Sequence, residues 1–247
     1  MGMPISLALR GRHGGTAEGR AAWAAVMAEL AEVDRVFSTY RVDSMVNRLD
    51  RGELRLDECP AVVAEVLALG GRAAAESGGA FSTSLPVDPA DPSGRRRLDP
   101  SGVVKGWAAE RAAQHLARLD GTDYCLSAGG DVTCRADRGS PPWRIGVEDP
   151  HDPSRVIAVV PLRTGAVATS GTAHRGAHLV DARTGRPPVG GVASVTVVGP
   201  SLAWADIDAT AAYAQGAGAA TWLRTRPIDS AVVVAADGAV ETVVPRR

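Results

Sequence analysis

The chain has 247 residues, of which 45% are hydrophobic and 22% charged, so it is long enough to bury a sizeable core. Lysine and arginine number 27 against 28 aspartate and glutamate, and the resulting net charge of −1 argues against a nucleic-acid-binding protein. No apolar run reaches the roughly 18 residues of a membrane span, and the start MGMPISLALRG lacks a secretory leader, so we expect a cytoplasmic protein without a membrane span.

The first half of the chain is predicted to be mainly helical. Apolar residues recur there at three- and four-residue steps, which is the periodicity of a helix with one buried face. Thr16 is a suitable N-cap, and Gly78-Gly79 is a suitable stop. In chain order, we expect a strand over 4–9, a helix over 17–36, a surface loop with at most one helical turn over 37–52, a helix from Pro60 to Gly78, a loop over 86–97 and a helix over 103–119.

After Leu119 the sequence changes to short β-rich runs separated by Gly-Gly, Pro-Pro and Asp-Pro. We expect strands over 122–127, 131–135, 143–148, 156–162, 166–169 and 193–199, helices over 201–216 and 218–224, and a closing hairpin of 230–235 and 239–244. Helices early and strands late favour an α+β fold. We therefore predict a single domain over 1–247, with helices packed on a mixed or antiparallel sheet, or two closely fused lobes that divide near residue 120.

Polar residues open the helix that is predicted after Leu98. Asp99, Ser101 and Gly102 lead into it, and Lys105 lies in its first turn. A lysine there opposes the helix dipole, whereas the free N–H groups of a helix start bind anions. We expect a nearby anion that removes this conflict; a simple cap with a solvated lysine is the alternative.

Two further segments combine glycines with small polar residues. Gly129-Gly130 follows a predicted strand and allows a ligand to approach the backbone, although a tight turn is the simpler explanation. Arginines and small hydroxyls suit phosphate oxygens, and a histidine can take a proton near neutral pH. The span 166–188 concentrates such residues, namely Thr169, Ser170, His174, Arg175, His178 and Arg183.

The helix predicted over 201–216 carries two oxygen-bearing side chains on one face. Asp206 and Thr210 are four positions apart, whereas Asp208 points elsewhere. A carboxylate and a hydroxyl suit Mg²⁺, which completes its octahedron with water and phosphate oxygens. The alternative is a Thr210 hydroxyl bonded to the carbonyl of Asp206, with a solvated carboxylate.

In order and over nearly the whole chain, these segments resemble the ApbE flavin transferases. The similar segments are MGMPISL (an MGT-type start), FSTYRVDSMVNRLD (FS-x-Y…S-E-I-x-R-L-N), GGAFSTS (GGAFDPT), LDPSGVVKG (DLGGIAKG), SAGGDV (NLGGDI), ATSG with HLVDARTG (ATSG…HIIDPRTG), and ADIDATAAYAQG (ADALSTALFVLG). The last two matches are long and specific.

The resemblance implies roles for individual residues. It places Mg²⁺ on Asp206, Thr210 and the backbone carbonyl of Gly102, and it makes His178 the proton acceptor. It also implies a set of residues along FAD, namely Met1, Tyr40, Ala80, Phe81, Ser82, Asp99, Lys105, Thr169 and Leu179.

Three positions depart from the family pattern. Met45 stands where glutamate is usual, Asp50 where asparagine is usual, and Ser82 where aspartate is usual. These changes reduce the acidic character of loops that we expect to face the cofactor. The implied metal ligands and Lys105 are unchanged.

The activity that the resemblance implies is a magnesium-dependent transfer of FMN from FAD to a Thr/Ser hydroxyl of an acceptor flavoprotein, with release of AMP. A FAD pyrophosphatase giving FMN and AMP would use the same residues and stays open. A FAD-binding module without turnover also stays open, because Met45 and Ser82 are altered. Replacing Asp206 with alanine is expected to remove metal-dependent activity and to leave the fold largely intact.

Overall fold

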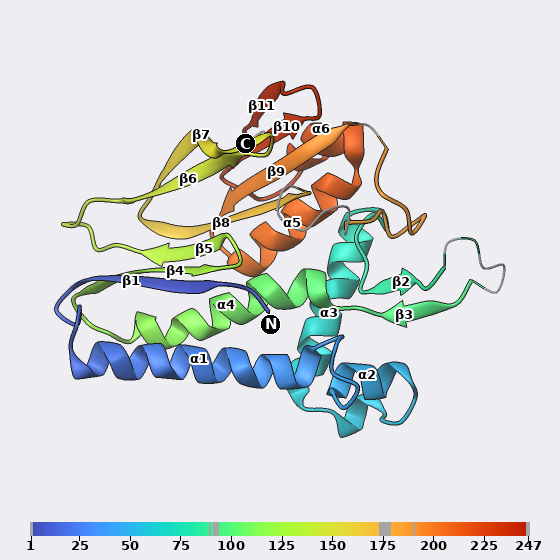
Figure 1. Cartoon of the computed structure of the whole chain (residues 1–247), viewed down its shortest axis with the longest axis horizontal. Helices are drawn as coiled ribbons and strands as arrows, with labels where there is room; N and C mark the ends of the chain where they lie inside the picture. The colour runs from blue at the N-terminus through green and yellow to red at the C-terminus, as the bar shows by residue number, and fades with distance from the viewer. Residues whose placement is uncertain (1, 89, 91–93, 173–178, 190, 246–247) are drawn as a thin grey trace.

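An antiparallel sheet lies at the centre of the molecule (Figure 1). The structure is a computed structural model that describes residues 2–88, 90, 94–172, 179–189 and 191–245. Within these residues the sheet has seven strands, in the spatial order β1 (Ile5–Gly11), β4 (Thr122–Ala128), β5 (Asp131–Arg135), β8 (Thr164–Gly171), β9 (Val192–Gly199), β10 (Ser230–Ala235) and β11 (Val240–Val243). Strand β1 pairs directly with β4, although helices α1 to α4 lie between these strands in the sequence, so both halves of the chain share one sheet.

Helices cover one face of this sheet in two layers. The described helices are α1 (Ala17–Phe37), α2 (Met45–Asp50), α3 (Ala61–Glu76), α4 (Ser101–Ala117), α5 (Leu202–Ala214) and α6 (Ala219–Leu223), with 3₁₀ turns at Leu56–Glu58 and Gly216–Gly218. Helices α4 and α5 pack on the sheet and on each other, and α1 packs on the outer side of α4 (Figure 1). The N-terminal helices are therefore held to the sheet through α4.

A two-stranded ribbon covers part of the opposite face. It consists of β6 (Trp143–Asp149) and β7 (Asp152–Leu162), and it packs Ile145 and Leu162 against Cys134 and Val167 of the sheet. A smaller hairpin of β2 (Ser84–Pro86) and β3 (Arg96–Leu98) projects from the molecule beside α3 (Figure 1). The central strands β8 and β9 are thus largely buried, which agrees with their content of valine and alanine, whereas alternate residues of the edge strand β1 are exposed.

Local sequence accounts for the helix that opens the chain. The Thr16 hydroxyl accepts a hydrogen bond from the backbone N–H of Gly19 at 3.2 Å, as predicted for an N-cap. Val26, Leu30, Val33 and Phe37 recur at three- and four-residue steps and are all buried. The single apolar face of α1 therefore lies on the core.

Helix α5 is different because it is buried on nearly every side. Eleven of its thirteen residues are buried, and most of these are alanines. Small side chains let a helix approach its neighbours closely, so α5 fits between the sheet, α4 and α3. The side chains of two buried aspartates on α5 have different partners. Asp208 pairs with Arg226 at 2.9 Å, and Asp206 accepts a hydrogen bond from the Gly106 N–H of α4.

The α+β fold with an antiparallel sheet is confirmed, and β10 and β11 pair as the predicted closing hairpin. Two segments expected as loops contain more order than the sequence suggested. Helix α2 lies in the segment 37–52, and the ends of the segment 86–97 pair as β2 and β3. The division into two lobes near residue 120 stays a prediction. Among the described residues, no helix is both long and apolar enough to cross a membrane.

The buried carboxylate of Asp123, at the start of β4, predicts how the stability of the protein varies with pH. Burial raises the pKa of Asp123, but hydrogen bonds from the Asp137 N–H and Ser140 and the charge of Arg10 outweigh it, so that its pKa lies below the usual value. A lowered pKa stabilises the folded state above the unfolded pKa, and this stabilisation disappears as the pH falls through the folded pKa.

The wild-type chain should therefore be more stable than Asp123→Asn near pH 6, and the difference should shrink toward about pH 3. Urea unfolding of both proteins at the two pH values measures this difference in unfolding free energy. Asp120→Asn removes an exposed carboxylate three positions earlier and serves as the control. A stability difference that stays constant over this pH range would contradict the assignment.

Candidate active site

Segments that are far apart in sequence line one cavity of about 490 Å³. They include the loop before β2, the start of α4, the turn between β4 and β5, the end of β8, the stretch 179–185, one face of α5 and the ribbon at Gly146 and Glu148. The lining includes most of the residues that the sequence predicted for a site, namely Ala80, Phe81, Ser82, Asp99, Gly102, Lys105, Thr169, Leu179, Asp206 and Thr210. The volume is in the range of small-molecule sites.

Other predicted residues are not placed in this cavity. Met1, His174, Arg175 and His178 lie outside the described residues, so their roles stay predictions. Tyr40 is described, is 96% exposed on the loop before α2, and is not among the residues that line the cavity. Its proposed contact with a flavin stays a prediction.

Lys105 is held between two carboxylates inside the cavity wall. Its ammonium lies 2.6 Å from Asp131 Oδ2 and 3.2 Å from Asp206 Oδ1. Both carboxylates are only 1% exposed, whereas the Lys105 side chain is 21% exposed. The predicted alternative of a solvated lysine is therefore wrong, because this lysine is enclosed by its partners.

Burial and neighbouring charges shift the pKa values of Lys105 and Asp206. Burial lowers the pKa of Lys105, but Asp206 and Asp131 outweigh burial and raise its pKa, so the ammonium stays charged. Burial raises the pKa of Asp206, and attraction to Lys105 only partly offsets it. With both carboxylates ionised, the group carries one net negative charge, which a cation in the cavity could neutralise.

The first turn of α4 is shaped by short-range contacts. Asp99 Oδ1 accepts hydrogen bonds from the N–H and the hydroxyl of Ser101, and Arg97 pairs with Asp99 at 3.0 Å. A Cβ on Gly102 would lie 2.9 Å from the ring of Phe81. Glycine is therefore needed for the aromatic ring to pack against the helix start.

The hydroxyls at the end of β8 reach α5. Ser170 Oγ lies 2.9 Å from Thr210 Oγ1, and Thr169 Oγ1 lies 2.9 Å from Thr196 Oγ1. Ser170 and Thr210 both line the cavity. The Thr210 hydroxyl therefore has a partner on the sheet and faces the cavity.

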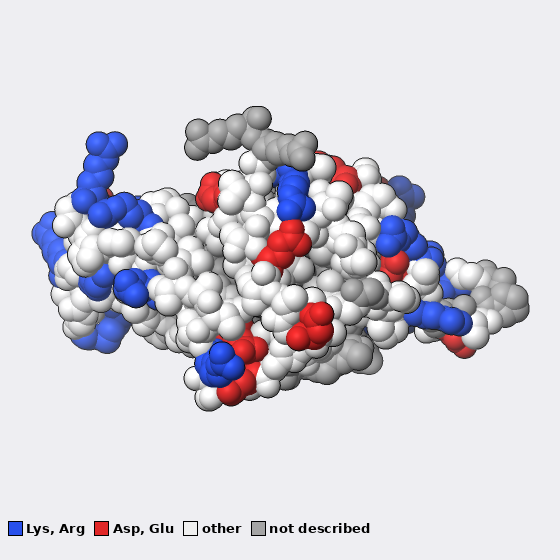
Figure 2. All heavy atoms as spheres, turned by 90° about the horizontal axis from the view of Figure 1, so that it is seen from above, with Lys and Arg blue, Asp and Glu red and all other residues white. Residues whose placement is uncertain are grey.

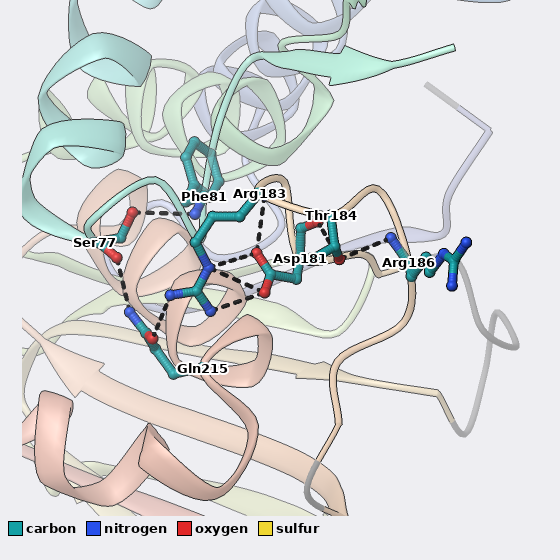
Figure 3. Close-up of polar contacts among 7 residues, drawn as sticks. All are labelled: Ser77, Phe81, Asp181, Arg183, Thr184, Arg186 and Gln215. Carbon is teal, nitrogen blue, oxygen red and sulfur yellow. Dashed lines mark hydrogen bonds and ion pairs between the residues drawn. The ribbon is translucent and has the colours of Figure 1, made fainter. Parts of the chain in front are cut away.

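A network around Arg183 holds the loop that carries Ala80 and Phe81 (Figure 3). The Arg183 guanidinium pairs with Asp181 at 2.8 Å and donates to Gln215 at 3.4 Å. Gln215 in turn donates to the Ser77 carbonyl, and the Ser77 hydroxyl accepts from the Phe81 N–H (Figure 3). The sequence suggested that this arginine suits phosphate, but the structure gives it a positioning role.

The positions that depart from the family pattern are separated in the structure. Ser82 lines the cavity, and its hydroxyl accepts from the Ser84 N–H. Met45 packs against the core, and Asp50 accepts a hydrogen bond from the Leu98 N–H at 2.6 Å. Of these three residues, only Ser82 contributes to the cavity wall.

The oxygen atoms of this cavity fit a hard divalent cation. Asp206 supplies a carboxylate and Thr210 a hydroxyl, and Gly102 lines the same cavity. The described residues hold no cluster of three or more His, Cys, Asp or Glu side chains suited to a metal. A donor set of one carboxylate and neutral oxygens matches Mg²⁺, which keeps room for water and phosphate, better than Zn²⁺.

Asp131 is the residue that the sequence reasoning missed. It follows the Gly129-Gly130 turn, in which both glycines have positive φ (61° and 94°), as a tight hairpin turn requires. The turn itself lines the cavity. A carboxylate directly after this turn, at the start of a buried strand, was the available signal.

Comparisons with known proteins show the family to which this chain is similar. The ApbE family model matches residues 1–87 and 87–233. The sequence is 37% identical to FAD:protein FMN transferase from Rhodobacter capsulatus over 129 residues, which are 49% of this chain and 24% of that protein. It is 32% identical to FAD:protein FMN transferase from Escherichia coli (strain K12) over 119 residues, which are 44% of this chain and 34% of that protein. These alignments span about a quarter to a third of the relatives' lengths.

Solved structures share the fold at low sequence identity. The ApbE protein from Thermotoga maritima has a TM-score of 0.82 at 22% identity, covering 98% of this chain and 94% of that one. Flavin transferase ApbE from Vibrio cholerae has a TM-score of 0.77 at 20% identity, covering 98% and 97%. Because the family model spans most of the chain, this protein belongs to the ApbE family.

Proposed function

We propose that this protein is a magnesium-dependent FAD:protein FMN transferase, which moves FMN from FAD to a threonine or serine hydroxyl of an acceptor protein and releases AMP. The observation that carries the proposal is the meeting of Lys105, Asp206, Thr210 and the start of α4 around one cavity. The activity named for the relatives from Rhodobacter capsulatus and Escherichia coli supports it.

The residues divide into those suited to the diphosphate and those suited to the flavin. The Lys105 ammonium is a donor for phosphate oxygens on one wall of the cavity. Phe81 and Leu179 offer apolar surface in the same cavity for an aromatic ring. FAD combines these two chemistries in one molecule.

A divalent cation bound by Asp206, Thr210 and the Gly102 carbonyl would supply positive charge against the phosphates. Lys105 would hold a phosphoryl oxygen in position for in-line attack by the acceptor hydroxyl on the FMN-side phosphorus. The bond from this phosphorus to AMP breaks, so that FMN is left in a phosphodiester with the acceptor. The role of His178 as proton acceptor stays a prediction.

Incubation with FAD, Mg²⁺ and a protein that carries a Thr/Ser flavinylation motif tests the proposal. The acceptor should gain the mass of an FMN group and fluoresce in a denaturing gel, and AMP should form in equal amount. Mutation of the acceptor threonine or serine to alanine is the control. Failure of every acceptor encoded near the gene to gain mass would count against transfer.

The same experiment separates the two other activities. Free FMN and AMP formed without an acceptor would identify a pyrophosphatase. Tight FAD binding by calorimetry with neither product would identify a binding module. The cytoplasmic location stays a prediction from the sequence.

A further inference from the structure

Asp131 is a buried carboxylate that the proposed reaction does not use directly. It begins β5 immediately after the Gly129-Gly130 turn and is 1% exposed. It is not among the residues that line the cavity, although Lys105 and both glycines of the turn are. Asp131 therefore acts on a substrate or metal only through its neighbours.

Its two oxygens have different partners. Oδ1 accepts a hydrogen bond from the Thr169 N–H at 3.0 Å, which ties β5 to β8. Oδ2 lies 2.6 Å from the Lys105 ammonium, closer than the 3.2 Å between this ammonium and Asp206 Oδ1. One oxygen of Asp131 thus binds the backbone of the sheet, and the other pairs with the lysine.

The second contact affects Asp206. A lysine with one buried carboxylate as its neighbour would pair with it fully, because an unpaired buried charge is costly. Asp131 supplies a second partner at 2.6 Å, and the three-residue group has one negative charge in excess when both carboxylates are ionised. Asp206 Oδ2 also accepts from the Gly106 N–H at 2.9 Å, so the Asp206 carboxylate is fixed in place.

We propose that Asp131 is a positioning residue that shares the Lys105 ammonium with Asp206 and so weakens the Lys105–Asp206 pair, which favours binding of a divalent cation by the Asp206 carboxylate. The inference rests on the proposed metal site and concerns the charges around it. Without the Asp131 charge, Lys105 would pair more strongly with Asp206 and would compete more effectively with the metal.

Asp131→Asn separates this role from a structural one. Asparagine keeps an oxygen that can accept from the Thr169 N–H but loses the charge that faces Lys105. Mg²⁺ affinity, measured by titration calorimetry with the metal alone and again with ADP present, should fall by at least about tenfold. Asp131→Glu restores the charge and should recover much of the affinity.

The matched control is Asp123→Asn. Asp123 is also buried and paired with an arginine, but it lies at the other end of the β4–β5 hairpin and is absent from the cavity wall. This variant should bind Mg²⁺ like the wild type. In the flavin assay, Asp131→Asn should need more Mg²⁺ for half-maximal rate, with a maximal rate close to wild type at saturating metal.

The outcomes distinguish the inference from the proposed function. Unchanged Mg²⁺ affinity in Asp131→Asn, with a wild type that binds the metal, would overturn the role of Asp131 alone. Equal losses in Asp131→Asn and Asp123→Asn would also overturn it, because general destabilisation would then explain both. A wild type that does not bind Mg²⁺ would overturn the metal site and this inference together.

Discussion

Asp206→Asn should lower the rate of FMN transfer by about 100-fold or more and remove its response to Mg²⁺. The carboxylate is the one charged oxygen donor in the proposed metal set, and loss of about 3 kcal/mol of transition-state stabilisation corresponds to this factor. Initial rates of acceptor labelling over a range of Mg²⁺ concentrations measure both effects.

Asparagine is a better choice here than alanine. Asp206 Oδ2 accepts from the Gly106 N–H inside the helix contact, and an alanine would leave that N–H without its partner at a cost of about 1–3 kcal/mol. The expectation from sequence that Asp206→Ala would leave the fold largely intact did not include this contact. Asparagine retains an oxygen in the same place.

Asp208→Asn is the matched control, because Asp208 is a buried carboxylate on the same helix. It pairs with Arg226 and is not among the residues that line the cavity. This variant should keep the wild-type dependence on Mg²⁺, even if it unfolds at a lower temperature. Asp206→Asn with a normal Mg²⁺ response would remove Asp206 from the metal site.

Gly106→Ala should damage both stability and activity. A Cβ at this position would lie 2.6 Å from the Leu202 carbonyl oxygen and 2.8 Å from the Asp206 Cβ, so α4 and α5 would have to separate. Overpacking of this kind costs about 1–3 kcal/mol, or a decrease in melting temperature of roughly 2–12 °C at this chain length. The displacement would also move Asp206 relative to Lys105.

Gly71→Ala should raise the stability of the protein, in contrast to Gly106→Ala. Gly71 is an exposed glycine in α3, and a Cβ there would meet nothing within 4 Å. Alanine should raise stability by about 0.5–1 kcal/mol because it favours the helix. Calorimetric melting of both variants tests the pair, and a Gly106→Ala protein as stable and active as wild type would show that α4 and α5 are not held by this contact.

Much of the fold could be predicted because its elements follow local rules. The three- and four-residue spacing of Val26, Leu30 and Val33 is visible in the sequence, and so is the cap at Thr16. The short strands β2 and β3 were missed, and the length of α2 was underestimated, because the stability of such elements comes from contacts with distant segments, including the bond between Asp50 and Leu98.

The candidate site also combines features that could be predicted from the sequence with features that could not. The sequence by itself determined the types and spacing of the donors on each element, such as Asp206 and Thr210 on one helix face. Only the tertiary structure decided that Asp131 pairs with Lys105 and that Arg183 is occupied by Asp181. The physical reason is that spacing along one element fixes which side chains share a face, whereas the partner of a buried charge depends on which other elements pack against that face.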